Sequence, residues 1–88
     1  MKNPFNYAVL KYFTTVSEAS GDDVFEALKR DYAHLKYYSR EAVYEILLTG
    51  ELNGFLQETR YKLRTNGQVE VFYTATAEEQ AVINKYIA

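Results

Sequence analysis

Three kinds of residue that support chemistry are scarce in this sequence: it has no cysteine, one histidine and four scattered glycines. Without cysteine the chain can form neither a disulfide nor a thiolate metal site, a composition typical of a reducing cytosol. A metal site needs several His, Cys or carboxylate ligands that converge on one point, and His34 has no such companions at ligand spacing. The scattered glycines do not form a phosphate-binding loop. We therefore expect no cofactor, no metal and no enzymatic activity.

Long apolar runs are also missing. No stretch approaches the ~18 residues of a membrane span, and the N-terminal MKNPFNYAVLKYF lacks the long apolar segment and small-residue cleavage site of a signal peptide. We expect a cytoplasmic protein that does not enter a membrane. The 88 residues, 48% of them hydrophobic, predict one domain over residues 1–88 that buries roughly 60% of its unfolded surface.

Charge gives only a weak indication of the partner. The net charge of −2 argues against a strong electrostatic grip on nucleic acid, because dedicated nucleic-acid binders are usually basic. Residues 29–64 nevertheless hold seven basic and five acidic side chains, a local charge of +2. The adjacent carboxylates Asp22-Asp23 and Glu78-Glu79 each lie at an expected helix start, where the helix dipole accounts for them.

The stretch from Ser39 to Tyr73 organises the rest of the chain. Ser39 is a good N-cap, and residues 40–52 carry Val43, Ile46, Leu47 and Gly50 at helical spacing. Asn53-Gly54 supplies a left-handed stop. The sequence therefore predicts a helix over residues 40–52 with one face toward a core.

Two extended runs follow and meet at Asn66-Gly67. Residues 55–63 alternate with period two, which predicts a strand with Phe55, Tyr61 and Leu63 on a buried face. An Asn-Gly pair favours a two-residue type I′ turn. This turn predicts the pairs Thr65–Gln68, Leu63–Glu70, Tyr61–Phe72 and Thr59–Thr74. The other face would carry the cations Arg60, Lys62 and Arg64 opposite Val69, Val71 and Tyr73.

Three further helices are expected outside this stretch. Asn3 as N-cap and Pro4 at the first position predict a helix over residues 4–14, after which there is room for one brief extended segment. Ser20 with Asp23 resembles a capping box for a helix that ends between Tyr32 and Leu35. Thr76 with Glu79 predicts a last helix over residues 77–87. Its expected inward residues are Val82, Ile83, Tyr86 and Ile87.

In this order of elements the chain resembles the winged helix-turn-helix family over nearly its whole length. The matching pieces are the helix that begins after Ser39 with its Gly54-Phe55-Leu56 exit, the hairpin around Asn66-Gly67, and the TATAEE entry to the closing helix. That entry is similar to the one in small bacterial members of the family. The resemblance implies an α+β winged-helix fold, with a three-helix core, a C-terminal β-hairpin wing and a closing fourth helix.

The resemblance also implies a DNA-binding transcription regulator in which the third helix enters the major groove and the wing touches phosphate. Seven residues would then contact DNA: Lys36, Tyr38, Arg40, Tyr44, Arg60, Lys62 and Arg64. The wing cations are suited to contact phosphates. The outward side of the third helix, however, carries Glu41, Glu45 and Glu51, whose carboxylates would repel the DNA phosphates. A second interpretation is that the wing cations form a solvated edge that deters strand-to-strand aggregation.

A protein-binding role is the alternative to DNA. The sequence has nine tyrosines, and tyrosine is enriched at protein interfaces. Tyr37, Tyr38 and Tyr44 are expected on one exposed surface near the start of the third helix. Other tyrosines are expected to seal the rim of the core: Tyr12, Tyr32, Tyr61 and Tyr86. The resemblance further implies a homodimer through the terminal helices, which the isoleucine- and tyrosine-rich last turn permits.

Overall fold

The structure, a computed structural model, describes residues 3–88 and contains four helices and three strands in the described part of the chain. In chain order the elements are α1 (Phe5–Tyr12), β1 (Ala19–Ser20), α2 (Gly21–Tyr32), α3 (Arg40–Leu52), β2 (Gln57–Leu63), β3 (Val69–Thr74) and α4 (Ala77–Tyr86). This order confirms the predicted α+β winged-helix architecture, including the brief strand between the first two helices.

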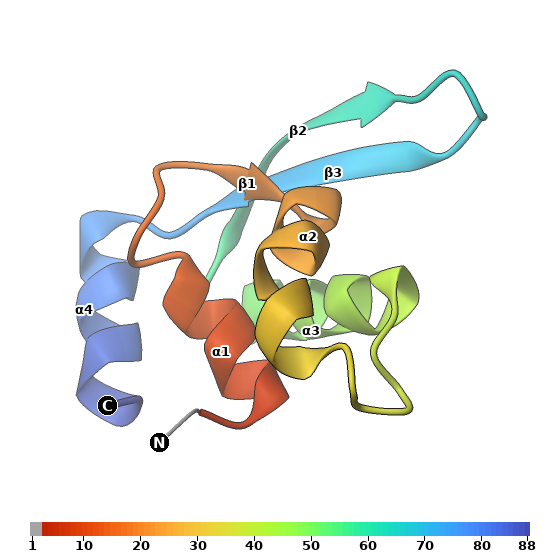
Figure 1. Cartoon of the computed structure of the whole chain (residues 1–88). Coiled ribbons are helices and arrows are strands. Elements are labelled where there is room, and N and C mark those ends of the chain that lie inside the picture. The colour runs from red at the N-terminus through yellow and green to blue at the C-terminus, as the bar shows by residue number, and fades with distance from the viewer. Residues whose placement is uncertain (1–2) are drawn as a thin grey trace.

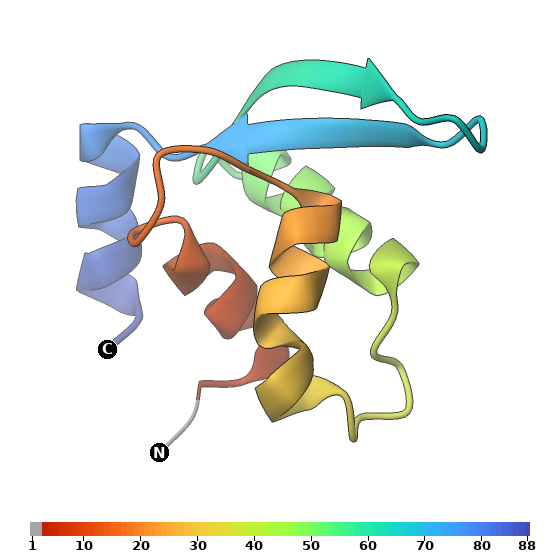
Figure 2. The same cartoon turned by 45° about the horizontal axis from the view of Figure 1, so that its top comes forward.

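The strands form one antiparallel sheet in the order β1-β3-β2, with β3 in the centre. The three helices α1, α2 and α3 pack together beneath it, and α4 lies against the side of α1 (Figure 1). The β2–β3 hairpin runs over the helices and projects beyond them (Figure 2). The core is made of fully buried side chains from every helix and from the chain between α3 and β2: Val9, Phe13, Val24, Val43, Leu47, Leu56 and Ile83. Each such side chain contributes about 1.5–3 kcal/mol when it is removed from water.

Three of the four predicted N-caps are confirmed, and the fourth, Asn3 at the first helix, is wrong. The Ser39 hydroxyl accepts a hydrogen bond from the Ala42 amide, and α3 spans the expected residues. Ser20 with Asp23 and Thr76 with Glu79 form complete capping boxes. Only α1 differs, because Pro4 is its N-cap and the helix ends at Tyr12 instead of Thr14.

The predicted hairpin register is wrong by one residue near the turn and by two at the base, where Gln57 and not Thr59 pairs with Thr74. Leu63 pairs with Val69, Lys62 with Glu70 and Tyr61 with Val71. The Arg64 amide donates to the Gln68 carbonyl, so the loop has three residues, 65–67, and the Gly67 amide closes it on the Arg64 carbonyl. Only Gly67 in this loop has a positive φ, +84°. This geometry is that of a type I turn followed by a left-handed glycine. It replaces the expected Tyr61–Phe72 aromatic pair with Arg60 opposite Phe72.

The predicted burial of β2 is also wrong. All seven of its residues are exposed, with Tyr61 and Leu63 at 72% and 68%. β2 is an edge strand, and it is drawn above β3, on the far side of β3 from α2 (Figure 2). At the start of the run it is Leu56 that enters the core, whereas Phe55 is only half-buried.

The prediction for α4 is half correct. Ile83 and Ile87 are buried, while Val82 is 41% and Tyr86 70% exposed. Residues four apart share one stripe of a helix, and α4 covers α1 with a single narrow stripe. The predicted rim tyrosines divide in the same way, since Tyr32 is buried and Tyr12 half-buried, whereas Tyr61 and Tyr86 are exposed.

Replacing Gly67 with Val should destabilise the protein, because a β-branched residue tolerates the left-handed conformation poorly. We expect a loss of about 1–3 kcal/mol, or roughly 4–8 °C in melting temperature per kcal/mol. Gly67→Asn is the matched control, since Asn enters this region more easily. Equal melting temperatures for the two variants would contradict the assigned turn.

Candidate nucleic-acid interface

The Asp22 carboxylate joins α2, α3 and the wing. It lies in the first turn of α2 and accepts hydrogen bonds from Arg40 Nε, at 3.0 and 3.1 Å, and from the Tyr44 hydroxyl, at 2.7 Å. Arg64 of the wing forms an ion pair with the same carboxylate. Arg40 and Tyr44 also hold β3, because the Arg40 guanidinium donates to the Val69 carbonyl and the Val71 amide donates to the Tyr44 oxygen.

These contacts set the protonation of both acidic groups. Partial burial raises the pKa of the Asp22 carboxyl, but hydrogen bonds from Arg40 and Tyr44 and the charges of Arg40 and Arg64 outweigh it, so the pKa is lowered. Burial and the hydrogen bond to Asp22 raise the pKa of Tyr44 to about 12. Tyr44 therefore stays protonated and donates to an ionised Asp22 at neutral pH.

Gly21 makes room for this arrangement. A Cβ atom at Gly21 would lie 2.3 Å from the Tyr44 ring, closer than van der Waals contact allows. The absence of a side chain at the first residue of α2 lets the ring lie against the helix and reach Asp22. Tyr44 therefore has a structural role, because it connects α3 to the start of α2 and to β3.

Arg60 is held by a separate ion pair. Its guanidinium lies 3.0 Å from Glu18, in the segment before β1, and 3.7 Å from the centre of the Phe72 ring. Hydrogen bonds from Thr59 and Arg60 lower the pKa of Glu18, so this carboxylate stays ionised. Arg60 therefore fixes the base of β2 to the rest of the molecule.

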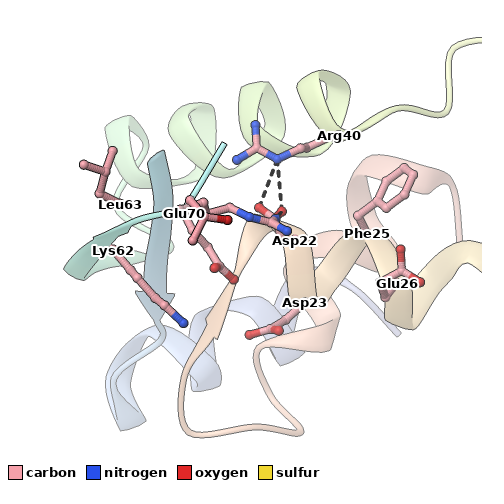
Figure 3. A pocket seen from close by; sticks show the side chains of 10 residues that line it. Asp22, Asp23, Phe25, Glu26, Arg40, Lys62, Leu63 and Glu70 are labelled. Carbon is pink, nitrogen blue, oxygen red and sulfur yellow. Dashed lines mark hydrogen bonds and ion pairs between the residues drawn. The ribbon is translucent and has the colours of Figure 1, made fainter. Parts of the chain in front are cut away.

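The structure brings three of the predicted contact residues into one concavity. Arg40, Lys62 and Arg64 line a hollow of about 540 Å³ between the start of α2, the start of α3 and the wing (Figure 3). Four carboxylates line it too: Asp22, Asp23, Glu26 and Glu70. The backbone of Lys62 pairs with Glu70 in the strand ladder, but its side chain makes no hydrogen bond or ion pair with any residue from 3 to 88, so its ammonium group is free to meet an external anion.

Two other predicted contacts lie apart from this hollow. Lys36 is exposed in the connection between α2 and α3 and, over the described chain, makes no hydrogen bond or ion pair. Tyr38 stacks on Phe25 at 4.8 Å and donates its hydroxyl to the Phe25 carbonyl. The predicted surface of three exposed tyrosines is wrong, because only Tyr37 is exposed, at 62%, while Tyr38 and Tyr44 are half-buried.

The outward side of α3 is acidic and apolar. Glu41 and Glu45 are exposed, as expected, and Leu48 and Leu52 are 51% and 78% exposed. The sequence interpretation missed Leu52 on this surface, and it missed Asp22 as a partner of the arginines. Asp22 is 18 and 42 residues from Arg40 and Arg64, so no local spacing connects them.

No group of three or more His, Cys, Asp or Glu side chains in residues 3–88 is arranged to hold a metal ion. None of the helices described here combines the length and the hydrophobicity that crossing a membrane requires.

Asp22→Asn should destabilise the protein by about 1.5–3 kcal/mol at pH 7, the usual contribution of hydrogen bonds to a charged group. Because the folded-state pKa is lowered, the ionised carboxylate stabilises the fold above the ordinary aspartate pKa of about 3.9. This stabilisation is lost as pH falls toward the folded-state pKa. Denaturant unfolding at several pH values should therefore show the variant approach the unmodified protein in acid.

Glu26→Gln, an exposed charge on the same helix, is the matched control and should change stability by less than about 0.5 kcal/mol. Equal effects of the two substitutions, or a difference that does not narrow in acid, would contradict the role of Asp22.

Comparison with known proteins places this geometry in a fold. No protein-family model matches the chain, and no curated protein sequence matches it. Among solved structures it is similar to Bacillus subtilis PadR in complex with operator DNA, with a TM-score of 0.68 and 20% identity over 92% of this chain. The chain spans 45% of the length of that PadR chain.

Two further structures are similar over 92% of this chain. A proposed transcriptional regulator from Thermoplasma acidophilum has a TM-score of 0.65 and 15% identity, over 74% of its own length. A PadR-like transcriptional regulator from Bacillus cereus has a TM-score of 0.64 and 16% identity, over 75% of its length. These likenesses show that the chain has the winged-helix fold.

Proposed function

We propose that this protein is a non-enzymatic winged-helix protein that binds double-stranded DNA and regulates transcription in the cytoplasm. The observation that most supports this role is the concavity that gathers Arg40 from the start of α3 with Lys62 and Arg64 from the wing. A similar fold has been solved with operator DNA bound, in PadR. Cations at the start of a helix and on a wing can contact successive phosphates along the sugar-phosphate backbone of a duplex.

In this proposal the phosphates are contacted by the wing cations at the rim of the hollow, because four carboxylates line the hollow beside its three cations, and not by the middle of α3. Glu41 and Glu45 would repel phosphate if α3 lay deep in a groove, whereas Lys36 at the entry to α3 extends the cationic path. Phosphate must also compete with Asp22 for Arg40 and Arg64. Binding is therefore expected to be weak at physiological salt and strong only at low salt.

Titration of the protein with mixed-sequence duplex DNA at low salt, followed by NMR, tests this role. Chemical-shift changes should gather at Lys36, Arg40, Lys62 and Arg64, and the affinity should fall with salt by about 0.9 log units per log unit of salt for each phosphate neutralised. Lys62→Ala should weaken binding evenly across sequences and reduce that slope by about one.

Lys85→Ala is the matched control, since this exposed lysine lies on α4, at the opposite end of the molecule from the tip of the wing (Figure 1). It should leave DNA binding unchanged. The proposal fails if the protein gives no response to DNA at low salt, or if the two lysine variants lose affinity equally.

We also propose that two copies pair through the terminal helices. Val82 and Tyr86 give α4 an exposed apolar stripe, and a two-fold dimer would present two wings to one duplex. Light scattering at high protein concentration should detect the dimer, and Tyr86→Ser should weaken it. A strict monomer at high concentration would contradict this pairing.

A further inference from the structure

A second hollow lies among the helices, and no residue of the hairpin lines it. It is formed by the start of α1, the end of α2, the connection of residues 33–39 and one side of α3. Figure 2 shows the start of α1 beside the end of α2, with the hairpin at the opposite side of the molecule. The volume of about 730 Å³ falls within the roughly 300–1,000 Å³ of pockets that hold small molecules. We call it the aromatic hollow and define it by six of its lining residues: Phe5, Tyr32, His34, Tyr37, Glu45 and Ile46.

Aromatic rings gather at this hollow around Phe5. The centre of the Phe5 ring lies 5.6 Å from that of Tyr32, 6.0 Å from that of Tyr37 and 5.4 Å from that of Tyr38. Phe5 and Tyr32 are only 5% and 7% exposed, whereas Tyr37 is 62% exposed. Phe5 and Tyr32 therefore form the floor of the aromatic hollow, and Tyr37 forms part of its rim.

Tyr37 is available to a ligand, because the fold makes little use of it. The hydroxyls of Tyr32 and Tyr38 donate to the carbonyls of Asn3 and Phe25. The Tyr37 hydroxyl makes no hydrogen bond with any residue from 3 to 88, and Phe5 is its one ring contact in that part of the chain. Most of the Tyr37 ring thus remains open to solvent at the edge of a hollow.

Glu45 gives the aromatic hollow a negative charge. It is the only carboxylate among the described residues that line the hollow, and no lysine or arginine lines it. The Glu45 side chain makes no hydrogen bond or ion pair within residues 3–88. It also lines an adjoining hollow of about 380 Å³ between α1 and α3, where it is the only charged residue in the described chain. An anionic ligand would meet an unpaired negative charge here, whereas a cationic ligand would neutralise it.

Rings and an unpaired carboxylate together favour one chemical class of ligand. The faces of aromatic rings carry negative potential and attract cations, and rings of this kind are the usual means of recognising quaternary ammonium groups. A carboxylate at the same hollow adds charge attraction. The buried Phe5 ring and the half-buried Ile46 side chain would contact an apolar body next to the charged group.

We propose that the aromatic hollow binds an organic cation. Its ammonium group would lie between the Tyr37 ring and the Glu45 carboxylate, and its aromatic or alkyl body would lie on Phe5 and Ile46. The aromatic hollow shares no lining residue with the hollow that holds the cations of the proposed DNA site. The ligand site therefore does not depend on DNA binding.

Benzyltrimethylammonium is the probe, titrated into the full chain at constant ionic strength and followed by NMR. Shifts should gather at residues 3–6, 34–37 and 42–46, with a dissociation constant of about 1 mM for so small a molecule. Benzyl alcohol and phenylacetate are the matched neutral and anionic probes. We expect benzyl alcohol to bind about threefold more weakly and phenylacetate about tenfold more weakly than the cation.

Two pairs of variants separate the ring from the charge. Tyr37→Leu keeps an apolar side chain but removes the ring, and it should weaken binding of the cation about two- to fivefold, whereas Tyr37→Phe should bind it normally. Glu45→Gln should weaken the cation about two- to fivefold and leave benzyl alcohol unchanged. Glu41→Gln is its control, because Glu41 is an exposed carboxylate of the same helix that does not line the hollow. All of these side chains are exposed, so the variants should fold normally, and their amide spectra report this directly.

Four results would overturn the proposal. The cation could cause no shifts, or shifts that lie outside the aromatic hollow. Phenylacetate could bind as tightly as the cation, which would remove the role of Glu45. Tyr37→Phe could lose as much affinity as Tyr37→Leu, which would remove the role of the ring. Dilution of the protein alone could shift the aromatic hollow in a way that Tyr37→Leu abolishes, which would make a second copy of the chain the occupant. Failure of the DNA titration would leave all of these measurements unaffected, so the two proposals can fail separately.

Discussion

The contacts of Asp22 hold the wing on the helices. β1 has only two residues and pairs with β3 at Tyr73 and Phe72, so strand pairing alone ties the sheet to the helices over a very short length. Beyond β1, the free edge of β3 receives the Arg40 guanidinium and the Tyr44 hydroxyl instead of another strand. Asp22 orients both side chains, and Ser20 adds a hydrogen bond of 2.6 Å to Glu70. The start of α2 therefore replaces a missing strand with side-chain contacts.

This arrangement also explains why the two faces of the hairpin differ. The ladder between β2 and β3 is irregular between Glu58 and Arg60, and such a bulge turns the residues that follow it relative to those before. As a result Arg60 meets Phe72 and Glu18, while Glu58 lies on the side of Tyr73. In the outer half of the hairpin, the register places Lys62 and Arg64 on one face of the strand pair and Tyr61, Leu63 and Val69 on the other. One small element thus presents two surfaces of opposite character.

Much of the fold could be predicted from local signals, because helix caps act within three or four residues. Ser39, Ser20 with Asp23, and Thr76 with Glu79 place three helix starts correctly. The hairpin register could not be derived in this way. Asn66-Gly67 suits a two-residue turn and also a three-residue loop that needs only one left-handed glycine. The choice between them depends on which pairing the rest of the strand accepts. Here Arg64 with Gln68 and Leu63 with Val69 is the pairing adopted.

The candidate site was less accessible to sequence reasoning than the fold. The alternation in residues 55–63 predicts which side chains share a face of the strand, but it does not indicate whether another element covers that face. Tyr61 and Leu63 were therefore expected inside and are outside. The cations Arg40, Arg60 and Arg64 were expected to be free, yet each has a carboxylate partner that lies 18 to 42 residues away. Long-range ion pairs of this kind leave no periodic signal in a single sequence.

The pairing of the arginines has a consequence for how the wing can act. Arg40 and Arg64 tie the wing to the helices through Asp22. A phosphate that binds these arginines in place of Asp22 leaves a half-buried carboxylate without its charged partners, which costs free energy. Phosphate binding to these two arginines therefore weakens the contacts that hold the wing on the helices. Lys62 can bind phosphate without such a loss, because its side chain has no ion-pair partner in residues 3–88. Within the described chain, Lys62 is therefore the wing cation best placed to bind a phosphate without weakening the contacts of Asp22.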